Sequence, residues 1–362
     1  MDKIVRILII GDWCWPQYAA AFAAGLQELG HEVLKFSVSP YFNGFLGKYQ
    51  SALPVPGPVL FRQNRDLLRF LQAESPDLML AWRCTHLLPA TIERTNALGV
   101  VTISYNNDDP FGPKAHGQVP WHHHFLWYWY LKTLKYYKFN FFFRQQNLAE
   151  AKSYGARHAQ VLMPYFIPWI DRPVTLDEEE TRRFACDVTF VGHYEPDGRE
   201  NYLRALVGAG LKVKLYGDSY WTRQVLGDLY DFFAPIVPAE GEDYAKALCG
   251  AKVCLAFLSK LNRDTYTSRC FEIPACGRAM LAERTDDLLK MFKEDEEACF
   301  FSSKEELVNK AKWLVENQDI REKIAQAGLR RVWADGHDVR SRAAQFIAMV
   351  SENPMRDHIK LG

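Results

Sequence analysis

The chain has 362 residues, with 44 lysines and arginines balanced by 44 aspartates and glutamates. A formal charge of zero gives no bulk reason to expect a nucleic-acid partner, and the length exceeds that of one ordinary core, which predicts two domains. Eight cysteines without a CxxC pair indicate free thiols in a reducing compartment rather than disulfides or zinc. Without a signal-peptide layout or an apolar run long enough to span a bilayer, we expect a cytoplasmic protein.

The first half of the chain alternates apolar, β-branched runs with helix-like stretches. The expected strands are 4–11, 31–38, 76–82, 100–106, 139–143 and 159–165. The expected helices are 17–30, 64–75, 89–99 and 144–155. Continuous apolar strands separated by helices are typical of a parallel sheet covered on both faces.

A second series of the same kind follows a stretch with three prolines, 163–173, which we interpret as an interdomain linker. Its expected strands are 186–192, 211–217, 252–258, 278–283 and 298–303. Its expected helices are 199–210, 242–251, 269–277, 286–292, 304–317 and 320–336.

The two series predict an α/β fold with two Rossmann-like parallel-sheet domains that face each other across a cleft. We expect the first domain at 1–165 and the second at 166–338. The remaining segment, 339–362, is expected to form a helix that packs on one of the domains, with the first as our candidate.

Three stretches of the second half resemble a known family. "RCFEIPACGRAMLAERTDDLLKMF" followed by "FSSKEELVNKAKWLVEN" resembles the C-terminal domain of GT-B glycosyltransferases, and "CDVTFVGHYEPDGRENYLRAL" resembles the start of that domain. The group typified by the spore-maturation protein CgeB is most similar, over residues 185–343. The resemblance implies a donor-binding second domain, an acceptor-binding first domain, and a nucleoside-diphosphate sugar as co-substrate with no other cofactor and no metal.

Donor binding needs a carboxylate for the ribose hydroxyls, and cations or amides for the diphosphate, where charge develops as the sugar leaves. By the resemblance, Glu272 binds ribose, and the residue eight positions earlier faces the donor sugar. That residue is Asp264, a shorter carboxylate, so its catalytic role stays open. Arg269, one helical turn before Glu272, is placed to bind phosphate, and Ser268 or Thr267 is expected to cap the helix.

Further donor contacts are expected in the loops that follow strands of the second domain. Gly192 would let its loop approach a ligand closely, His193 would be a donor in that loop, and Arg199 would reach a phosphate. The alternative is a plain turn with a solvated histidine. Tyr216 would stack on the base and Tyr266 would contact the donor sugar, or both lie in ordinary loops.

The acceptor side is expected at the strand ends of the first domain. Trp13 and Trp15 would stack on an acceptor sugar, or else close the sheet edge. Arg83 and His86, after the third strand, are expected to point at the cleft.

Two adjacent carboxylates, Asp108 and Asp109, follow the fourth strand. One of them would act as the general base that deprotonates an acceptor hydroxyl, as in an inverting enzyme. The alternative is that they cap the turn before Pro110. The sequence does not separate the two residues.

Residues 121–143 combine aromatic residues, histidines and lysines. Consecutive histidines such as His122, His123 and His124 fan out by about 100° each on a helix, so no metal site is expected there. We interpret the stretch as an aromatic core segment, with peripheral contact to the inner face of a membrane as the alternative.

These features favour a transferase that moves a sugar from a nucleotide donor, with UDP as the candidate nucleotide, to a saccharide or lipid-linked glycan in cell-envelope or surface polysaccharide assembly. A nucleotide-sugar epimerase of the same architecture and a non-catalytic, nucleotide-sugar-binding assembly protein remain alternatives. A dehydrogenase is disfavoured, since no GxGxxG follows the first strand of either domain.

Overall fold

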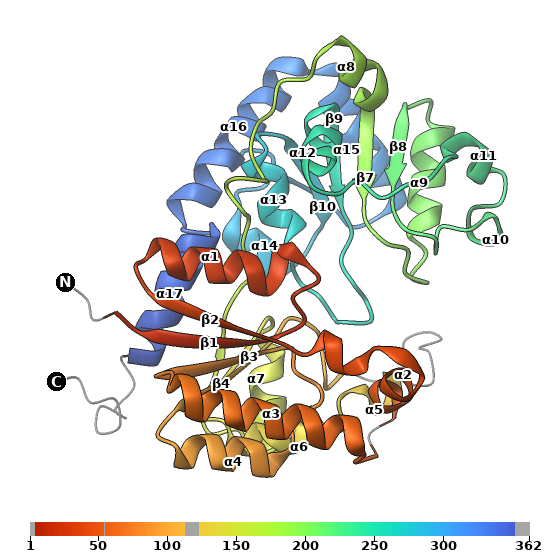
Figure 1. Cartoon of the computed structure of the whole chain (residues 1–362). Helices are drawn as coiled ribbons and strands as arrows, with labels where there is room; N and C mark the ends of the chain where they lie inside the picture. Colours follow the sequence, from red (N-terminus) through yellow and green to blue (C-terminus); the bar gives the residue numbers. More distant parts are fainter. Residues whose placement is uncertain (1–3, 54, 113–122, 352–362) are drawn as a thin grey trace. The chain divides into compact units, whose positions relative to one another are not determined.

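A computed structural model describes residues 4–53, 55–112 and 123–351 (Figure 1). The chain divides into two compact units. The first contains the residues up to Pro164 together with those from Val339 onward, and the second is Tyr165–Asp338.

The first unit is built on a six-stranded sheet in the order β2-β1-β3-β4-β5-β6, in which all neighbours pair in parallel. The strands are β1 (Arg6–Gly11), β2 (Glu32–Ser37), β3 (Leu78–Trp82), β4 (Val101–Asn106), β5 (Phe139–Phe142) and β6 (Ala159–Val161). The α-helices are α1 (Ala21–Glu28), α2 (Gly44–Ala52), α3 (Pro58–Glu74), α4 (Pro89–Ala97), α5 (His123–Leu126), α6 (Tyr128–Thr133), α7 (Gln146–Ser153) and α17 (Val339–Ser351).

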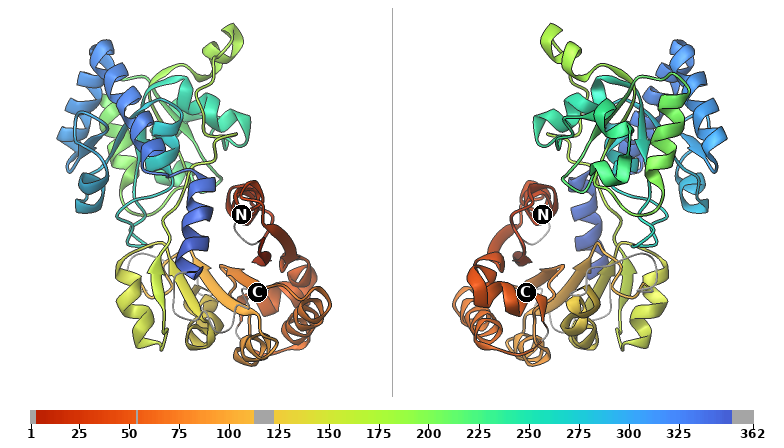
Figure 2. Two further views of the ribbon diagram at one scale, coloured as in Figure 1. Left: turned by 90° about the vertical axis from the view of Figure 1, so that its left-hand side faces the viewer. Right: turned by 90° about the vertical axis from the view of Figure 1, so that its right-hand side faces the viewer.

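Both faces of this sheet are covered by helices. On one face Leu8 and Ile10 of β1 pack in a buried cluster with residues of α3 and α4. On the other face α17 lies beside α1 (Figures 1 and 2). The ring of Phe346 in α17 lies 5.5 Å from that of Phe22 and 5.4 Å from that of Phe141. The expected packing of the C-terminal helix on the first domain is thus confirmed as far as Ser351.

The second unit is a five-stranded parallel sheet in the order β11-β10-β9-β7-β8. The strands are β7 (Cys186–Val191), β8 (Val213–Tyr216), β9 (Ala251–Ala256), β10 (Ala279–Glu283) and β11 (Cys299–Phe301). The helices are α8 (Glu178–Phe184), α9 (Arg199–Gly208), α10 (Arg223–Leu226), α11 (Leu229–Phe233), α12 (Glu242–Cys249), α13 (Arg269–Ala275), α14 (Asp286–Met291), α15 (Lys304–Glu316) and α16 (Gln318–Ala334).

The core of the second unit lies between its sheet and α9 and α15, where Leu206 and Leu314 join Val188 and Leu255 in one buried cluster. The predicted α/β fold with two Rossmann-like parallel sheets is confirmed. All eight cysteines are free, as expected, and all but Cys14 are buried.

The boundary between the two units falls inside 163–173, but this stretch is not an unpacked linker, because much of it is packed into the second unit. Phe166 is fully buried, and its N–H donates to the carbonyl of His337 at 3.0 Å. Asp171 is also buried, and its Oδ2 accepts from the N–H of Ile167 at 2.6 Å. Other residues of the stretch, among them Trp169 and Arg172, are exposed.

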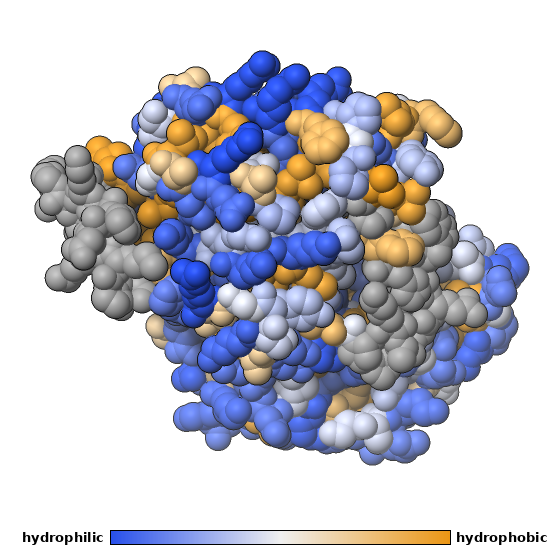
Figure 3. Space-filling view, turned by 90° about the horizontal axis from the view of Figure 1, so that it is seen from below, coloured by the Kyte–Doolittle hydropathy of each residue, from blue (hydrophilic) through white to orange (hydrophobic). Residues whose placement is uncertain are grey.

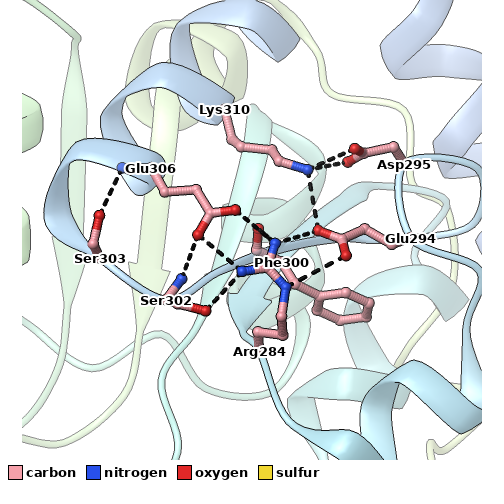
Figure 4. A network of polar contacts seen from close by, with 8 residues as sticks. All are labelled: Arg284, Glu294, Asp295, Phe300, Ser302, Ser303, Glu306 and Lys310. Carbon is pink, nitrogen blue, oxygen red and sulfur yellow. Dashed lines mark hydrogen bonds and ion pairs between the residues drawn. The ribbon is translucent and has the colours of Figure 1, made fainter.

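A network of charged groups fixes the end of β10 to α15 (Figure 4). Arg284, the residue after β10, donates to Glu306 at 2.6 Å and also to Glu294. Lys310 joins the same group through Glu294 at 3.2 Å and Asp295 at 2.6 Å. The network holds the carboxyl end of β10, where Glu283 accepts a hydrogen bond from the N–H of Leu258 in the loop after β9.

Candidate active site

In the second unit the strand order reverses between β7 and β9, and ligands of open parallel sheets bind beyond the carboxyl ends of the strands at such a point. The loop after β7 starts at Gly192, and the loop after β9 leads into α13. The second loop is fixed at both ends. The N–H of Leu258 donates to Glu283 at 2.9 Å, and Thr265 donates to Asp287 at 2.7 Å.

Glu272 lies half-buried in α13 and has a polar partner from a different helix. The hydroxyl of Tyr244, in α12, donates a hydrogen bond to its Oε2. Burial raises the pKa of Glu272, whereas the bond from Tyr244 and the charge of Arg269 act in the opposite direction. Burial, and then the charge of Glu272, raise the pKa of Asp171 well above its ordinary value. Ionisation of both carboxyl groups at once is therefore unfavourable.

Gly192 and Arg269 meet at the end of β7. Arg269 donates from Nε to the carbonyl of Val191 at 2.6 Å, and its guanidinium lies 5.7 Å from the ring centre of Phe190. A Cβ on Gly192 would lie 2.7 Å from Nη2 of Arg269, so a larger residue would displace the guanidinium. The structure brings Gly192, Arg269 and Glu272 into one region at the switch point.

Arg199 is buried and is engaged within its own loop. Its Nε and Nη2 donate to Asp197 at 2.9 and 2.7 Å, and Nη1 donates to the carbonyl of His193 at 2.9 Å. A direct phosphate contact would cost these bonds, so the geometry favours a role in shaping the loop. His193 is exposed, with Nε2 3.0 Å from Oε1 of Glu195. Glu195 also accepts from Ser259 at 2.9 Å and so joins the two loops.

The other predicted donor residues differ in their surroundings. Tyr216 is buried at the end of β8, where burial raises its pKa to about 12, and this argues against its ring stacking on a base. Tyr266 is also buried. Ser268 stands at the N-cap of α13, but its hydroxyl makes no capping hydrogen bond, so the expected cap is wrong at this residue. Asp264 is half-buried, and its N–H donates to Ser259 at 2.8 Å.

In the first unit the strand order reverses between β1 and β3, and charged residues follow the strands there. Arg83, after β3, donates from Nε to Oδ2 of Asp108, after β4. Burial lowers the pKa of Arg83, but the charges of Asp108 and Asp12 outweigh this and raise it. Its φ of 49° is unusual for a residue with a side chain, and an N–H bond of 2.8 Å to Tyr105 holds it. Strain of this kind gathers at functional sites.

The two adjacent aspartates, Asp108 and Asp109, have different surroundings in the structure. Asp109 is buried, and its Oδ1 accepts from the N–H groups of Phe111 and Gly112 at 3.1 and 3.0 Å and from the Asn147 amide at 2.9 Å. This is the turn-capping arrangement. Asp108 is about a quarter exposed and contacts Arg83, which leaves it as the carboxylate of the pair that faces outward.

Asp12, directly after β1, was not singled out by the sequence. It accepts from Ser39 at 2.6 Å and from the N–H of Cys14 at 3.0 Å. Burial raises its pKa, but these bonds and the charge of Arg83 bring it below the ordinary value. The signal for it in the sequence is a carboxylate directly after the first strand.

The remaining acceptor candidates fall into two groups. Trp15 is half exposed, and Trp13 is partly buried with Nζ of Lys35 4.8 Å from its ring centre. His86 instead is largely buried and contacts the backbone of the first unit. Its Nε2 lies 3.1 Å from the carbonyl of Ser51, and burial lowers its pKa to about 4, so the ring is neutral near pH 7.

Within residues 4–53, 55–112 and 123–351, no group of three or more His, Cys, Asp or Glu residues is placed to hold a metal ion. His122 lies outside the described residues, as do the side chains of His123 and His124. In the described part of 121–143, the rings of Tyr130, Tyr137 and Phe142 are buried, in line with the core interpretation. Among all the residues that the structure describes, no helix has the length and apolar character that a bilayer span requires.

A known protein family matches part of the chain. Residues 199–348 match a family described as glycosyl transferase-like. No curated protein matches the sequence.

Solved structures match nearly the whole chain. Anabaena HepE in complex with UDP and glucose is 12% identical with a TM-score of 0.62, over 96% of this chain and 99% of that one. OtsA is 12% identical with a TM-score of 0.65, over 96% and 99%. A putative UDP-N-acetylglucosamine 2-epimerase from Listeria monocytogenes is 12% identical with a TM-score of 0.56, over 96% of each chain.

At this identity the structural matches show the fold alone, which is the two-domain GT-B fold. The chain therefore has the GT-B fold and carries a glycosyl transferase-like domain over residues 199–348.

Proposed function

We propose that the protein transfers a sugar from a nucleoside-diphosphate donor to a saccharide or lipid-linked glycan, in the assembly of a cell-surface polysaccharide, as expected for a member of the CgeB group. UDP is the proposed nucleotide, supported by the UDP complexes of HepE, which has the same fold. The donor binds to the second unit and the acceptor to the first.

The observation that carries this proposal is the grouping of Glu272, Arg269 and Gly192 at the switch point of the second sheet. Glu272 supplies a carboxylate oxygen for the ribose hydroxyls, and the other oxygen keeps its bond from Tyr244. Arg269 and the backbone beside Gly192 offer positive charge and N–H groups to the diphosphate, which stabilises charge on the leaving nucleotide. Arg199 holds the shape of this loop.

On the acceptor side, Asp108 is the proposed general base and Trp15 the proposed stacking surface. Arg83 fixes the carboxylate of Asp108 and carries positive charge that suits an acceptor with a phosphate group. Asp12 lies close enough for its charge to raise the pKa of Arg83.

The first experiment measures binding and turnover together. The protein is incubated with UDP-, GDP- and ADP-sugars, with and without glycan acceptors, and the released nucleoside diphosphate is quantified. Acceptor-dependent release supports the transferase. Conversion of a sugar without release would assign an epimerase, and binding without any conversion would assign a non-catalytic role.

The second experiment tests the ribose contact. Glu272→Ala should weaken affinity for the nucleoside diphosphate by about 1.5–3 kcal/mol, because a charge-assisted hydrogen bond is lost. Glu296→Ala, at an exposed glutamate of the same unit, is the matched control and should leave affinity unchanged. Equal affinities of the two variants would remove Glu272 from the site.

A further inference from the structure

The helix α2 presents its large apolar side chains to solvent. Its buried residues are Gly47 and Gln50, whereas Phe45 is 89% exposed and Tyr49 is 54% exposed. Phe45 and Tyr49 are four residues apart and so lie on one side of the helix. Surface helices of soluble proteins normally show the opposite distribution, with the large apolar side chains toward the core.

The helix is held in place without these apolar residues. Oε1 of Gln50 accepts from the N–H groups of Val59 and Leu60 at 2.8 and 3.3 Å, which satisfies donors at the start of α3. Gly47 packs so closely that a Cβ there would lie 2.5 Å from the carbonyl carbon of Phe42. Polar bonds and backbone contact therefore hold α2 in place. The outward rings of Phe45 and Tyr49 are not needed for this and are available for contact with a partner.

Neighbouring elements extend the exposed apolar area. Helix α2 packs against α3 and α5, which contribute side chains that are also at least 44% exposed. We call the whole area the α2 surface, and its apolar residues are Phe45, Leu46, Tyr49, Val55, Phe61 and Phe125. In Figure 3, apolar side chains are seen among mostly hydrophilic ones on one face of the molecule.

The charged residues of α2 and of the first part of α3 are basic, and the acidic residue that follows them, Asp66, is paired with Arg65 at 3.1 Å. The chain as a whole has equal numbers of acidic and basic residues, yet residues 33–65 and 110–149 contain no aspartate or glutamate. Lys48 in α2 and Arg62 in α3 are exposed basic residues that lie next to the apolar residues of this surface in the sequence. Exposed aromatic and aliphatic side chains beside the exposed Lys48 and Arg62 match the chemistry of an anionic lipid surface, where rings enter the headgroup region and cations contact phosphates.

We propose that the α2 surface docks the protein on a membrane that contains anionic phospholipid. Phe45 and Tyr49 insert among the headgroups, and Lys48 and Arg62 contact lipid phosphates. The proposal locates the membrane contact in 44–62 with Phe125, whereas most rings of the described part of 121–143 are internal. It does not depend on sugar transfer, and its test measures binding only.

The test is sedimentation of the full chain with vesicles of phosphatidylcholine alone, or of phosphatidylcholine and phosphatidylglycerol in equal amounts, at low and high salt. We expect binding to the anionic vesicles that weakens with salt. The Phe45→Ser/Tyr49→Ser variant should bind these vesicles about tenfold more weakly or worse. The control is Phe232→Ser/Leu289→Ser, at exposed apolar residues of the second unit, and it should bind like the wild type.

A second variant, Lys48→Glu/Arg62→Glu, changes exposed charges and keeps the test decisive if the first variant folds poorly. It should lose the preference for anionic vesicles. Wild-type protein that ignores anionic vesicles, or variants of the α2 surface that bind as well as the control, would overturn the proposal. A dimer in sedimentation velocity that Phe45→Ser/Tyr49→Ser dissociates, without vesicle binding, would instead assign the surface to a second copy of the chain.

Discussion

Asp108 and Asp109 illustrate how far neighbouring residues can differ once the chain is folded. The carboxylate of Asp109 accepts bonds from two backbone N–H groups and one amide inside the first unit, whereas that of Asp108 meets the guanidinium of Arg83. Both follow β4, and only the direction in which the turn leaves the strand decides which one is internal. Asp109 therefore stabilises the turn, and Asp108 is the residue of the pair that we propose as the general base.

This difference gives a paired prediction. Asp109→Ala should lower the free energy of unfolding by about 2–4 kcal/mol, because buried donors lose their acceptor. Asp108→Ala should change it by less than about 1 kcal/mol, since its partner is partly exposed, but should strongly reduce kcat. Urea unfolding measures the stability of the two variants, and turnover assays measure their kcat. An Asp109→Ala protein as stable as the wild type would contradict the capping role.

Tyr244 offers a second prediction at this scale. Its hydroxyl opposes the effect of burial on Glu272, so Tyr244→Phe should raise the pKa of that carboxyl further. Since the ionised carboxylate is the form that accepts ribose hydroxyls, affinity for the nucleoside diphosphate should fall, and the pH at which affinity appears should move upward. Calorimetric titration over a range of pH measures this. Tyr230→Phe, on α11, serves as the control and should leave the profile unchanged.

Among the elements, β10 and α15 are joined by charged groups in addition to the apolar core that they share. The bonds to Arg284 depress the pKa of Glu306 to about 2, from an unfolded value near 4.5. A carboxyl group with a depressed pKa contributes stability above its unfolded pKa and loses that contribution as pH falls toward the folded value. The network should therefore weaken between these two pH values.

The corresponding prediction uses Glu306→Gln. At neutral pH the variant should be less stable than the wild type by about 1–2 kcal/mol, since charge-assisted bonds to Arg284 are weakened. The difference should shrink as pH falls toward about 2, where both proteins are neutral at this position. Urea midpoints along the pH series provide the measurement, and a difference that is constant with pH would show that the network adds no electrostatic stability.

The sequence patterns predicted most helices and strands. They missed a helix whose apolar residues do not face the core. The expected helix 304–317 is Lys304–Glu316, and the expected strand 100–106 is Val101–Asn106, since both carry a clear apolar period. The helix α2 was not predicted, because its apolar residues face outward. Tyr244 was missed for another reason: it lies 28 residues before Glu272 on a different helix, and no local spacing connects them.

At the scale of the whole molecule, the two units differ in how the chain builds them. The second is one continuous segment, Tyr165–Asp338, whereas the first is completed by α17 from the far end of the described chain. Glu272, Arg269, Tyr244 and Gly192 all belong to the continuous segment. Its sheet and its buried cluster are complete without any other part of the chain.

We therefore expect residues 165–338, produced alone, to fold and to bind the same nucleoside diphosphate as the full chain. In the full chain, Phe346→Ala should destabilise the first unit by about 3–5 kcal/mol, because a fully buried ring between Phe22 and Phe141 is removed. Scanning calorimetry should show a shifted transition, while nucleotide binding by the second unit persists. Loss of both together would mean that the two units do not unfold separately.

The return of α17 to the first sheet also bears on biosynthesis. A ribosome makes the strands of the first unit early, yet the helix that covers Phe22 and Phe141 is translated only after the whole of Tyr165–Asp338. Domains usually acquire structure in the order of their synthesis. Here the second unit can fold before the first is complete. Until α17 is made, one apolar face of the first sheet is uncovered, and we expect chaperones to bind it.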